Sequence, residues 1–178
     1  MGRFAKLNND IQQLGLKMLE NQDICKLIYY PDSQIIDKPD VDADEILHKR
    51  LFLFTSKLPL AAEQGTYVMI RPYRFRPSGG GHFIISLLCF DIYTHQDARR
   101  IVFKDSKGEL LSGDRVLLLM GKIDEFMNKG VNFNVGKENL DGSAEIDTRN
   151  ADFAGFTFAG QGGKSDCEAQ RKFKTTVS

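Results

Sequence analysis

Histidine side chains are the first candidates for chemistry in this sequence, because imidazole can act as a general acid or base near neutral pH. The chain has three: His48, His82 and His95. Asp91 stands four positions before His95, but on a regular strand that spacing separates them by roughly 13 Å, too far for a dyad. No G-x-S-x-G or H-E-x-x-H motif accompanies them. We therefore expect no enzyme and no catalytic residue, with His82 and His95 at the solvated ends of a strand.

Two glycine-rich segments and one acidic segment could bind phosphate or a metal. Residues 77–81 and 160–164 lack a P-loop motif and a following helix, whose N-terminus would hold an anion. The acidic segment contains Asp37, Asp40, Asp42, Asp44 and Glu45. Its start resembles a calcium loop, but Glu45 replaces the glycine at position six and Leu51 the glutamate at position twelve. We expect a flexible hairpin tip, helix capping by the acidic residues, and no metal or cofactor.

Arginines alternate with aromatic residues along one predicted strand, a pattern that can bind single-stranded nucleic acid. The arginines are Arg71, Arg74 and Arg76. On a regular strand Tyr73 and Phe75 share one face while Arg74 and Arg76 share the other. This favours a strand with an apolar inner face and a basic outer face. The alternative is a small α+β binding module that contacts nucleic acid through the three arginines.

Composition limits the remaining classes. The chain has 178 residues, enough for one domain with a proper core, and 24 basic residues balance 24 acidic ones. A general nucleic-acid or membrane-surface protein usually carries a basic excess. No apolar run approaches the roughly 20 residues that span a bilayer. Cys25, Cys89 and Cys167 show no metal or disulfide spacing, which indicates a reducing compartment, with Cys25 and Cys89 as buried apolar side chains.

Hydrophobic periodicity predicts helices at both ends of the main body. Apolar residues recur at steps of three and four over residues 3–20, 21–30 and 114–129. Pro31 is expected to end the second helix. In the last helix, Asp114 is expected to be the N-cap, and Gly130 the C′ residue that follows the C-terminal end. The acidic residues at 42–45 start a further short helix.

Strands fill the middle of the chain. They are predicted at 49–58, 66–76, 82–95 and 152–160, and residues 100–105 are predicted to be a strand or an extended arm. Pro72 requires a sheet edge or a bulge, and Gly155 suggests another bulge. Residues 131–150 are expected to be irregular. The fold class is α+β, a mostly antiparallel sheet with a long hairpin, packed by N-terminal helices and the amphipathic helix 114–129.

The domain organisation follows from these elements. Residues 1–160 form a single α+β domain, with a helical segment at 1–48 and a sheet–helix core at 49–160. Residues 161–178 form a polar tail that buries little apolar surface and needs a partner surface to be ordered.

The predicted strand 82–95 is apolar on both faces. One face carries Phe83, Ile85, Leu87 and Cys89, and the other carries Ile84, Leu88, Phe90 and Ile92. Both faces must therefore be covered. Helix 114–129 is the natural cover for one, and the N-terminal helix or another subunit for the other.

Three stretches together resemble the neck and tail-completion proteins of tailed bacteriophages. They are LENQDICKLIYYPDSQIIDKPDV at 19–41, FIISLLCFDIYTHQD at 83–97 and RVLLLMGKIDEFMNK at 115–129. The matching positions are Asn21, Asp23, Tyr29, Tyr30, Asp91 and His95. The motifs are patterns of helix, tyrosine-rich turn and sheet, and they carry over no catalytic role.

The resemblance implies a structural virion protein, a ring-forming tail terminator or head-to-tail joining subunit, made in the host cytoplasm and located at the phage neck. Its partners would be copies of itself, as in a homohexamer, and other neck or tail-tube proteins, with passing contact to genomic DNA in the lumen. Neither a membrane nor a small-molecule substrate is expected. The candidate subunit or lumen contacts are Arg71, Arg74, Arg76, Phe83, Ile85 and Leu87.

Overall fold

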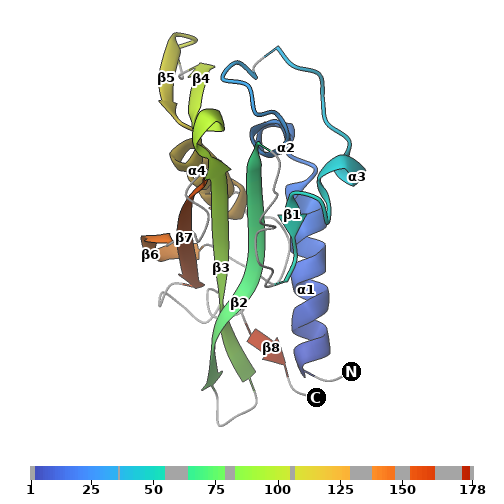
Figure 1. Ribbon diagram of the computed structural model, residues 1–178. Helices are drawn as coiled ribbons and strands as arrows, with labels where there is room; N and C mark the ends of the chain where they lie inside the picture. The colour runs from blue at the N-terminus through green and yellow to red at the C-terminus, as the bar shows by residue number, and fades with distance from the viewer. Residues whose placement is uncertain are drawn as a thin grey trace.

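Two long antiparallel strands, β2 (Thr66–Ser78) and β3 (Phe83–His95), run the length of the main sheet (Figure 1). The computed structural model describes residues 3–35, 37–54, 64–78, 83–104, 107–128, 138–146, 153–162 and 174–176. Within these residues the protein combines helices with a mostly antiparallel sheet, which confirms the α+β class and the long hairpin.

The main sheet has the order β1–β2–β3–β7–β6. The other strands are β1 (Leu51–Phe52), β6 (Glu138–Ile146) and β7 (Phe153–Gly162). Among the described strands of this sheet, β1 pairs in parallel with β2, and the other pairings are antiparallel. The second edge of β3 pairs with β7 over Leu88–His95 and with β8 (Lys174–Thr176) over Phe83–Ile85. A segment near the C-terminus is therefore hydrogen-bonded to the central strand.

The helices pack on one face of this sheet. They are α1 (Arg3–Met18), α2 (Gln22–Tyr29), the short α3 (Ala43–Ile46) and α4 (Arg115–Asn128). The largest buried side chains of α1, α2 and α4 form one core cluster with Phe90 and Ile92 of β3. The expected covering of one sheet face by helix 114–129 is confirmed, and the N-terminal helices cover the same face.

Local chemistry explains where the helices begin, end and approach the sheet. The side chain of Asn21 accepts a hydrogen bond from the Asp23 amide at 3.1 Å, and Tyr30 is extended before Pro31. Gly15 costs α1 some helix propensity. A Cβ at Gly15 would lie 2.3 Å from Cδ2 of Leu53, so the glycine lets that buried side chain pack closely.

A bulge interrupts the long hairpin at the predicted proline. Pro72 pairs with Leu88 and Arg74 with Leu87, so Tyr73 is the extra residue. The prediction of an edge or bulge at Pro72 is confirmed. The bulge predicted at Gly155 is wrong, because the pairing of β3 with β7 is regular there and the shift lies in β6, between Leu140 and Gly142.

Two strand predictions need correction. Residues 138–146 form β6, where irregular structure was expected, because pairing with the edge of β7 stabilises a polar strand whose own sequence does not alternate. The first strand is only Leu51–Phe52, since Leu53 and Phe54 form a bend, and 55–58 lie outside the described residues. The hairpin tip at 79–81 and Gly130 also lie outside them.

A second sheet projects from the end of the molecule. β4 (Arg100–Lys104) pairs with β5 (Leu110–Asp114), a strand that sequence periodicity did not predict. Figure 1 shows this β4–β5 hairpin extending beyond the main sheet, above α4. A short 3-10 helix, η1 (Gln96–Ala98), connects it to β3.

Candidate interaction surface

The bulge in β2 changes which arginine positions share a face. Arg71 pairs with Cys89, Arg74 with Leu87 and Arg76 with Ile85. Directly paired residues in an antiparallel sheet lie on the same face, so the three arginine positions share the face of the odd-numbered β3 positions. On a strand without a bulge, Arg71 would lie on the face opposite Arg74 and Arg76; the extra residue Tyr73 brings the three positions onto one face.

Arg71 is engaged within the sheet. Its Nη2 donates to Oδ1 of Asp91 at 3.2 Å, and its Nε forms an ion pair with the other carboxylate oxygen. Only 6% of the Asp91 side chain is exposed. The hydrogen bond with Asp91 raises the pKa of Arg71. This arginine therefore holds a buried carboxylate on β3.

The predicted apolar contact positions pair with both neighbouring strands. Phe83 lies opposite Ser78 and Thr176, Ile85 lies opposite Arg76 and Lys174, and Leu87 lies opposite Arg74. The side chains at 83–87 and at 73–78 lie outside the described part of the structure. Their role as subunit or lumen contacts stays a prediction.

Farther along β3, both faces are buried within one chain. Phe90 and Ile92 belong to the helical core, and on the other face Cys89 is 3% exposed. Met69 of β2, which lies opposite Asp91, is also buried. Over this half of the strand, a second subunit is not needed to remove its apolar side chains from water.

The other residues singled out for chemistry have structural contacts. Asp42 caps α3 by accepting from the Asp44 amide at 3.1 Å, and Asp40 pairs with Lys26 at 2.9 Å, which confirms the capping interpretation of the acidic segment. Nδ1 of His95 accepts from the Asp97 amide at 3.3 Å. His82 lies outside the described residues.

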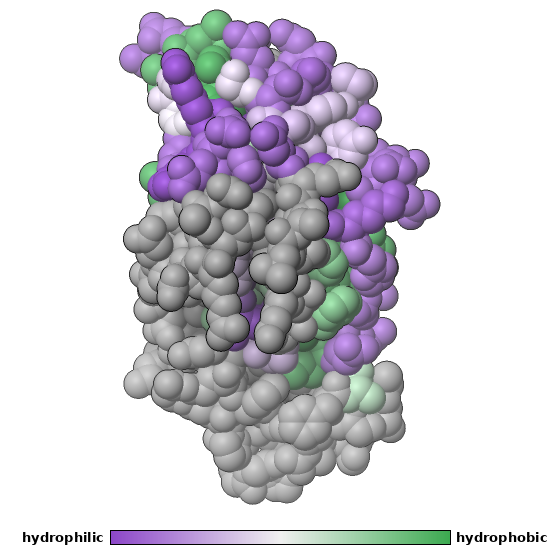
Figure 2. Space-filling view, in the orientation of Figure 1, coloured by the Kyte–Doolittle hydropathy of each residue, from purple (hydrophilic) through white to green (hydrophobic). Residues whose placement is uncertain are grey.

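Exposed leucines distinguish the β4–β5 hairpin. Leu110 is 64% exposed and Leu111 is 43% exposed, and Leu117 at the start of α4 is 61% exposed. Figure 2 shows hydrophobic surface among polar atoms at this end of the molecule. Successive strand residues point to opposite faces, so Leu110 and Leu111 leave apolar surface on both sides of the hairpin.

The base of the hairpin is firmly attached. Asp114 forms an ion pair with Arg99, and its Oδ1 accepts from the Val116 amide at 2.8 Å, which confirms it as a capping residue of α4. The Val102 amide donates to the carbonyl of Ser33 at 2.7 Å. A positive φ of 83° at Gly108 allows the turn before β5. The leucines are thus presented from a fixed support.

Arg115 organises the surroundings of this support. Its fully buried guanidinium donates to five carbonyl oxygens, those of Leu27, Tyr30, Pro31, Asp32 and Ala98. Burial lowers the pKa of Arg115 to about 10, so the group remains protonated at neutral pH. Because five N–H donors meet five acceptors, one side chain connects the end of α2, the loop after it, η1 and α4.

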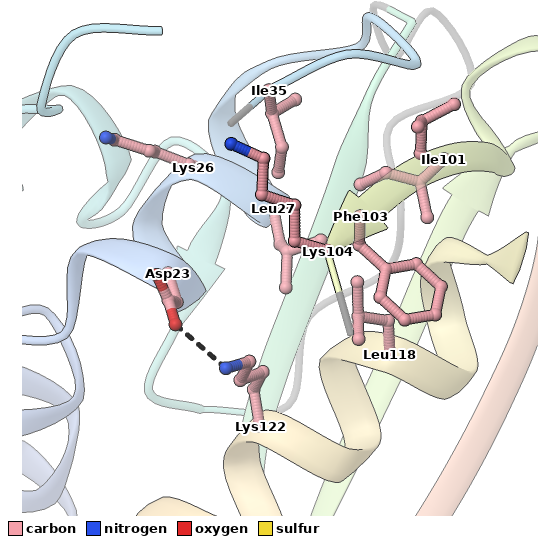
Figure 3. Close-up of a pocket in the computed structure, with 10 residues that line it drawn as sticks. Asp23, Lys26, Leu27, Ile35, Ile101, Phe103, Lys104, Leu118 and Lys122 are labelled. Carbon is pink, nitrogen blue, oxygen red and sulfur yellow. Dashed lines mark hydrogen bonds and ion pairs between the residues drawn. The ribbon is translucent and has the colours of Figure 1, made fainter. Parts of the chain in front are cut away.

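A pocket of about 230 Å³ lies between α2, β4 and α4. Its lining consists of Asp23, Lys26, Leu27, Ile35, Ile101, Val102, Phe103, Lys104, Leu118 and Lys122. Figure 3 shows Lys122 directed at Asp23, Lys26 pointing outward and Lys104 extending across the apolar side chains. Sequence periodicity did not reveal this pocket, because its residues come from four separate segments.

Residues 21–159 match the model of a protein family described as YomW. The chain belongs to the YomW family. The match includes α2, α4 and the β4–β5 hairpin, and therefore both the pocket and the exposed leucines. YomW is the name of a protein from the SPBc2 phage region of Bacillus, which associates the family with phages.

Two further comparisons do not narrow the function beyond this family. Neither a comparison with curated proteins nor one with solved structures finds a match for this YomW-family chain. In the described part of the chain, no helix is both long and apolar enough to cross a membrane. Among the same residues, no group of three or more His, Cys, Asp or Glu could hold a metal ion.

Proposed function

We propose that this YomW-family protein is a structural subunit of a tailed-phage particle. It acts at the neck as a ring-forming tail terminator or as a head-to-tail joining subunit, catalyses no reaction and contacts copies of itself and other neck or tail-tube proteins. The phage association of the family and the resemblance of three sequence stretches to neck proteins support this role.

The observation that carries the proposal is the exposed β4–β5 hairpin. A short two-stranded sheet with Leu110 and Leu111 exposed on opposite faces is poorly suited to remain in water. Its attachment through Asp114 and Val102 holds it in place before a partner arrives. Ring subunits need such surfaces because heterologous contacts that close by rotation use two different patches of one chain.

The experiment removes the gene from the phage and images the particles by electron microscopy. Full heads beside unattached tails would support a joining role, and overlong tails would support a terminator. Normal particles would contradict the proposal. Complementation with the double variant Leu110→Ser, Leu111→Ser should leave the defect in place. The matched control is Leu16→Ser, which changes a 45% exposed leucine on α1, outside the family match, and should restore normal particles.

A second candidate function is nucleic-acid binding through the basic strand. It is favoured by the register, which places positions 71, 74 and 76 on one sheet face. The Arg71–Asp91 ion pair argues against it, because one of the three charges is already compensated. Salt-sensitive DNA binding by a stable monomer, lost in Arg74→Glu, Arg76→Glu, would favour this candidate.

A further inference from the structure

The pocket between α2, β4 and α4 combines an apolar floor with a cationic rim. The most buried floor residues are Leu27, Ile35 and Ile101, with 2%, 8% and 0% exposure. Phe103 and Leu118 are partly buried and complete the apolar lining. A volume of about 230 Å³ accommodates one large apolar side chain together with adjoining backbone.

The rim carries three lysines and one aspartate. Lys122 donates to Asp23 at 2.8 Å, and Lys26 pairs with Asp40 at 2.9 Å. The hydrogen bond with Asp23 raises the pKa of Lys122, which keeps its ammonium charged. The Lys104 side chain forms no ion pair or hydrogen bond with any residue that the structure describes. Among the described residues, Lys104 is therefore the rim lysine whose charge is not paired with a carboxylate, and it lies next to apolar surface.

The recess continues along the outer side of β4. A second pocket of about 380 Å³ shares Val102 and Lys104 with the first, and its lining also includes Asp37, Lys38 and the exposed Leu110. Lys38 pairs with Asp32 at 3.0 Å, so Lys104, which lines both pockets, is the cation that an incoming chain would meet. A chain lying across both pockets would pass from the apolar floor, past Lys104, to Leu110. This extended shape suits a peptide segment better than a compact small molecule.

We infer that this pair of recesses is the docking site for an acidic segment of a partner protein, one that inserts an apolar side chain over Leu27 and Leu118 and places a carboxylate at Lys104. Charge complementarity selects the segment, and burial of the apolar side chain provides most of the affinity. The inference rests on the proposed function for the source of the segment, another protein of the phage particle.

The test titrates the full-length protein, with labelled amides and methyl groups, against three capped peptides followed by NMR. The first has Phe-Leu flanked on each side by two glutamates, the second has lysines in place of the glutamates, and the third has Ser-Ser in place of Phe-Leu. We expect the first alone to shift the methyl signals of Leu27, Ile101 and Leu118 saturably. Its affinity should fall at least fivefold when salt is raised from 50 to 500 mM.

Two charge-reversal variants test whether the peptide binds at this pair of recesses. Lys104→Glu should weaken the first peptide at least fivefold, whereas Lys49→Glu, which changes an exposed lysine near α3, should leave its affinity unchanged. Equal binding of the lysine or serine peptide, or an absence of saturable shifts, would overturn the inference. Preferential binding of octanoate would overturn it in favour of a small amphipathic anion. Because the titration uses no phage particles, its result is independent of the outcome of the gene deletion.

Discussion

The two hairpins of this protein differ in how many of their apolar side chains are covered. In the β2–β3 hairpin, Phe90 and Ile92 are fully buried, and Cys89 on the other face is 3% exposed. In the β4–β5 hairpin, Leu110 is 64% exposed. The apolar character of a strand therefore does not show by itself whether its side chains are covered. The elements that pack beside the strand decide that.

The number of neighbours explains the difference. β3 has β2 on one edge, β7 and β8 on the other, and helices over one face. The β4–β5 sheet has two strands, and its β4 strand attaches it to the body: Ile101 is buried in the core, and Val102 bridges with Gln34. A two-stranded sheet cannot cover both of its own faces. Its leucines are therefore available for contact with another protein.

The largest expected effect concerns the base that joins the two regions. Arg115→Met would remove the donor from five carbonyl oxygens, two in buried hydrogen bonds and three in partly buried ones, and each unsatisfied buried group costs about 1–3 kcal/mol. We expect a loss of about 5 kcal/mol in the free energy of unfolding, measured by urea denaturation. A loss below about 1 kcal/mol would show that water or other groups replace the guanidinium.

The next effect tests the covered hairpin. Phe90→Ala removes a fully buried ring from the core between β3 and the helices, and should lower the free energy of unfolding by about 3–5 kcal/mol. Equilibrium urea denaturation measures the change. Phe54→Ala is the matched control, because Phe54 is 50% exposed and its removal should cost much less.

A smaller effect appears with alkaline pH. Burial raises the pKa of the Cys25 thiol from 9.0 to about 11, so above pH 9 the unfolded chain releases this proton before the folded chain does. The thiol's contribution is complete below pH 9 and is lost as pH rises to 11, about 2–3 kcal/mol in all. Unfolding at pH 8 and 11 should show a steeper decline for the wild type than for Cys25→Ala. Equal slopes would contradict burial of the thiol.

The smallest effect on stability belongs to the exposed hairpin. Leu110→Ser should change the free energy of unfolding by no more than about 0.5 kcal/mol, since the side chain is already largely in water. Thermal and urea denaturation of the isolated protein measure it. A loss above about 1.5 kcal/mol would mean that Leu110 is packed within its own chain and would remove the contrast between the hairpins.

Local signals predicted much of the fold. The helices at 3–18, 22–29 and 115–128 follow apolar spacing, and Pro31 and Asp114 act at or next to their ends as expected. Pro72 predicted the bulge, because a proline cannot donate to a neighbouring strand. Each of these features depends on residues a few positions apart, so the sequence displays them directly.

Contacts between residues far apart in the chain determine the features that the sequence did not predict. β6 is a strand because β7 lies beside it, and the pocket exists because α2, β4 and α4 converge. In the sequence, Arg115 is an ordinary residue of the first turn of a helix. Its role depends on five carbonyl partners up to 88 positions away, which only the folded chain brings to it.

The sequence by itself determined the class of the fold, the amphipathic helices and the need to cover both faces of the strand at 82–95. Only the tertiary structure decided that the chain covers much of that strand itself and leaves the leucines of β5 exposed. The physical reason is that hydrophobicity is a property of a residue, whereas burial is a property of its neighbours in space.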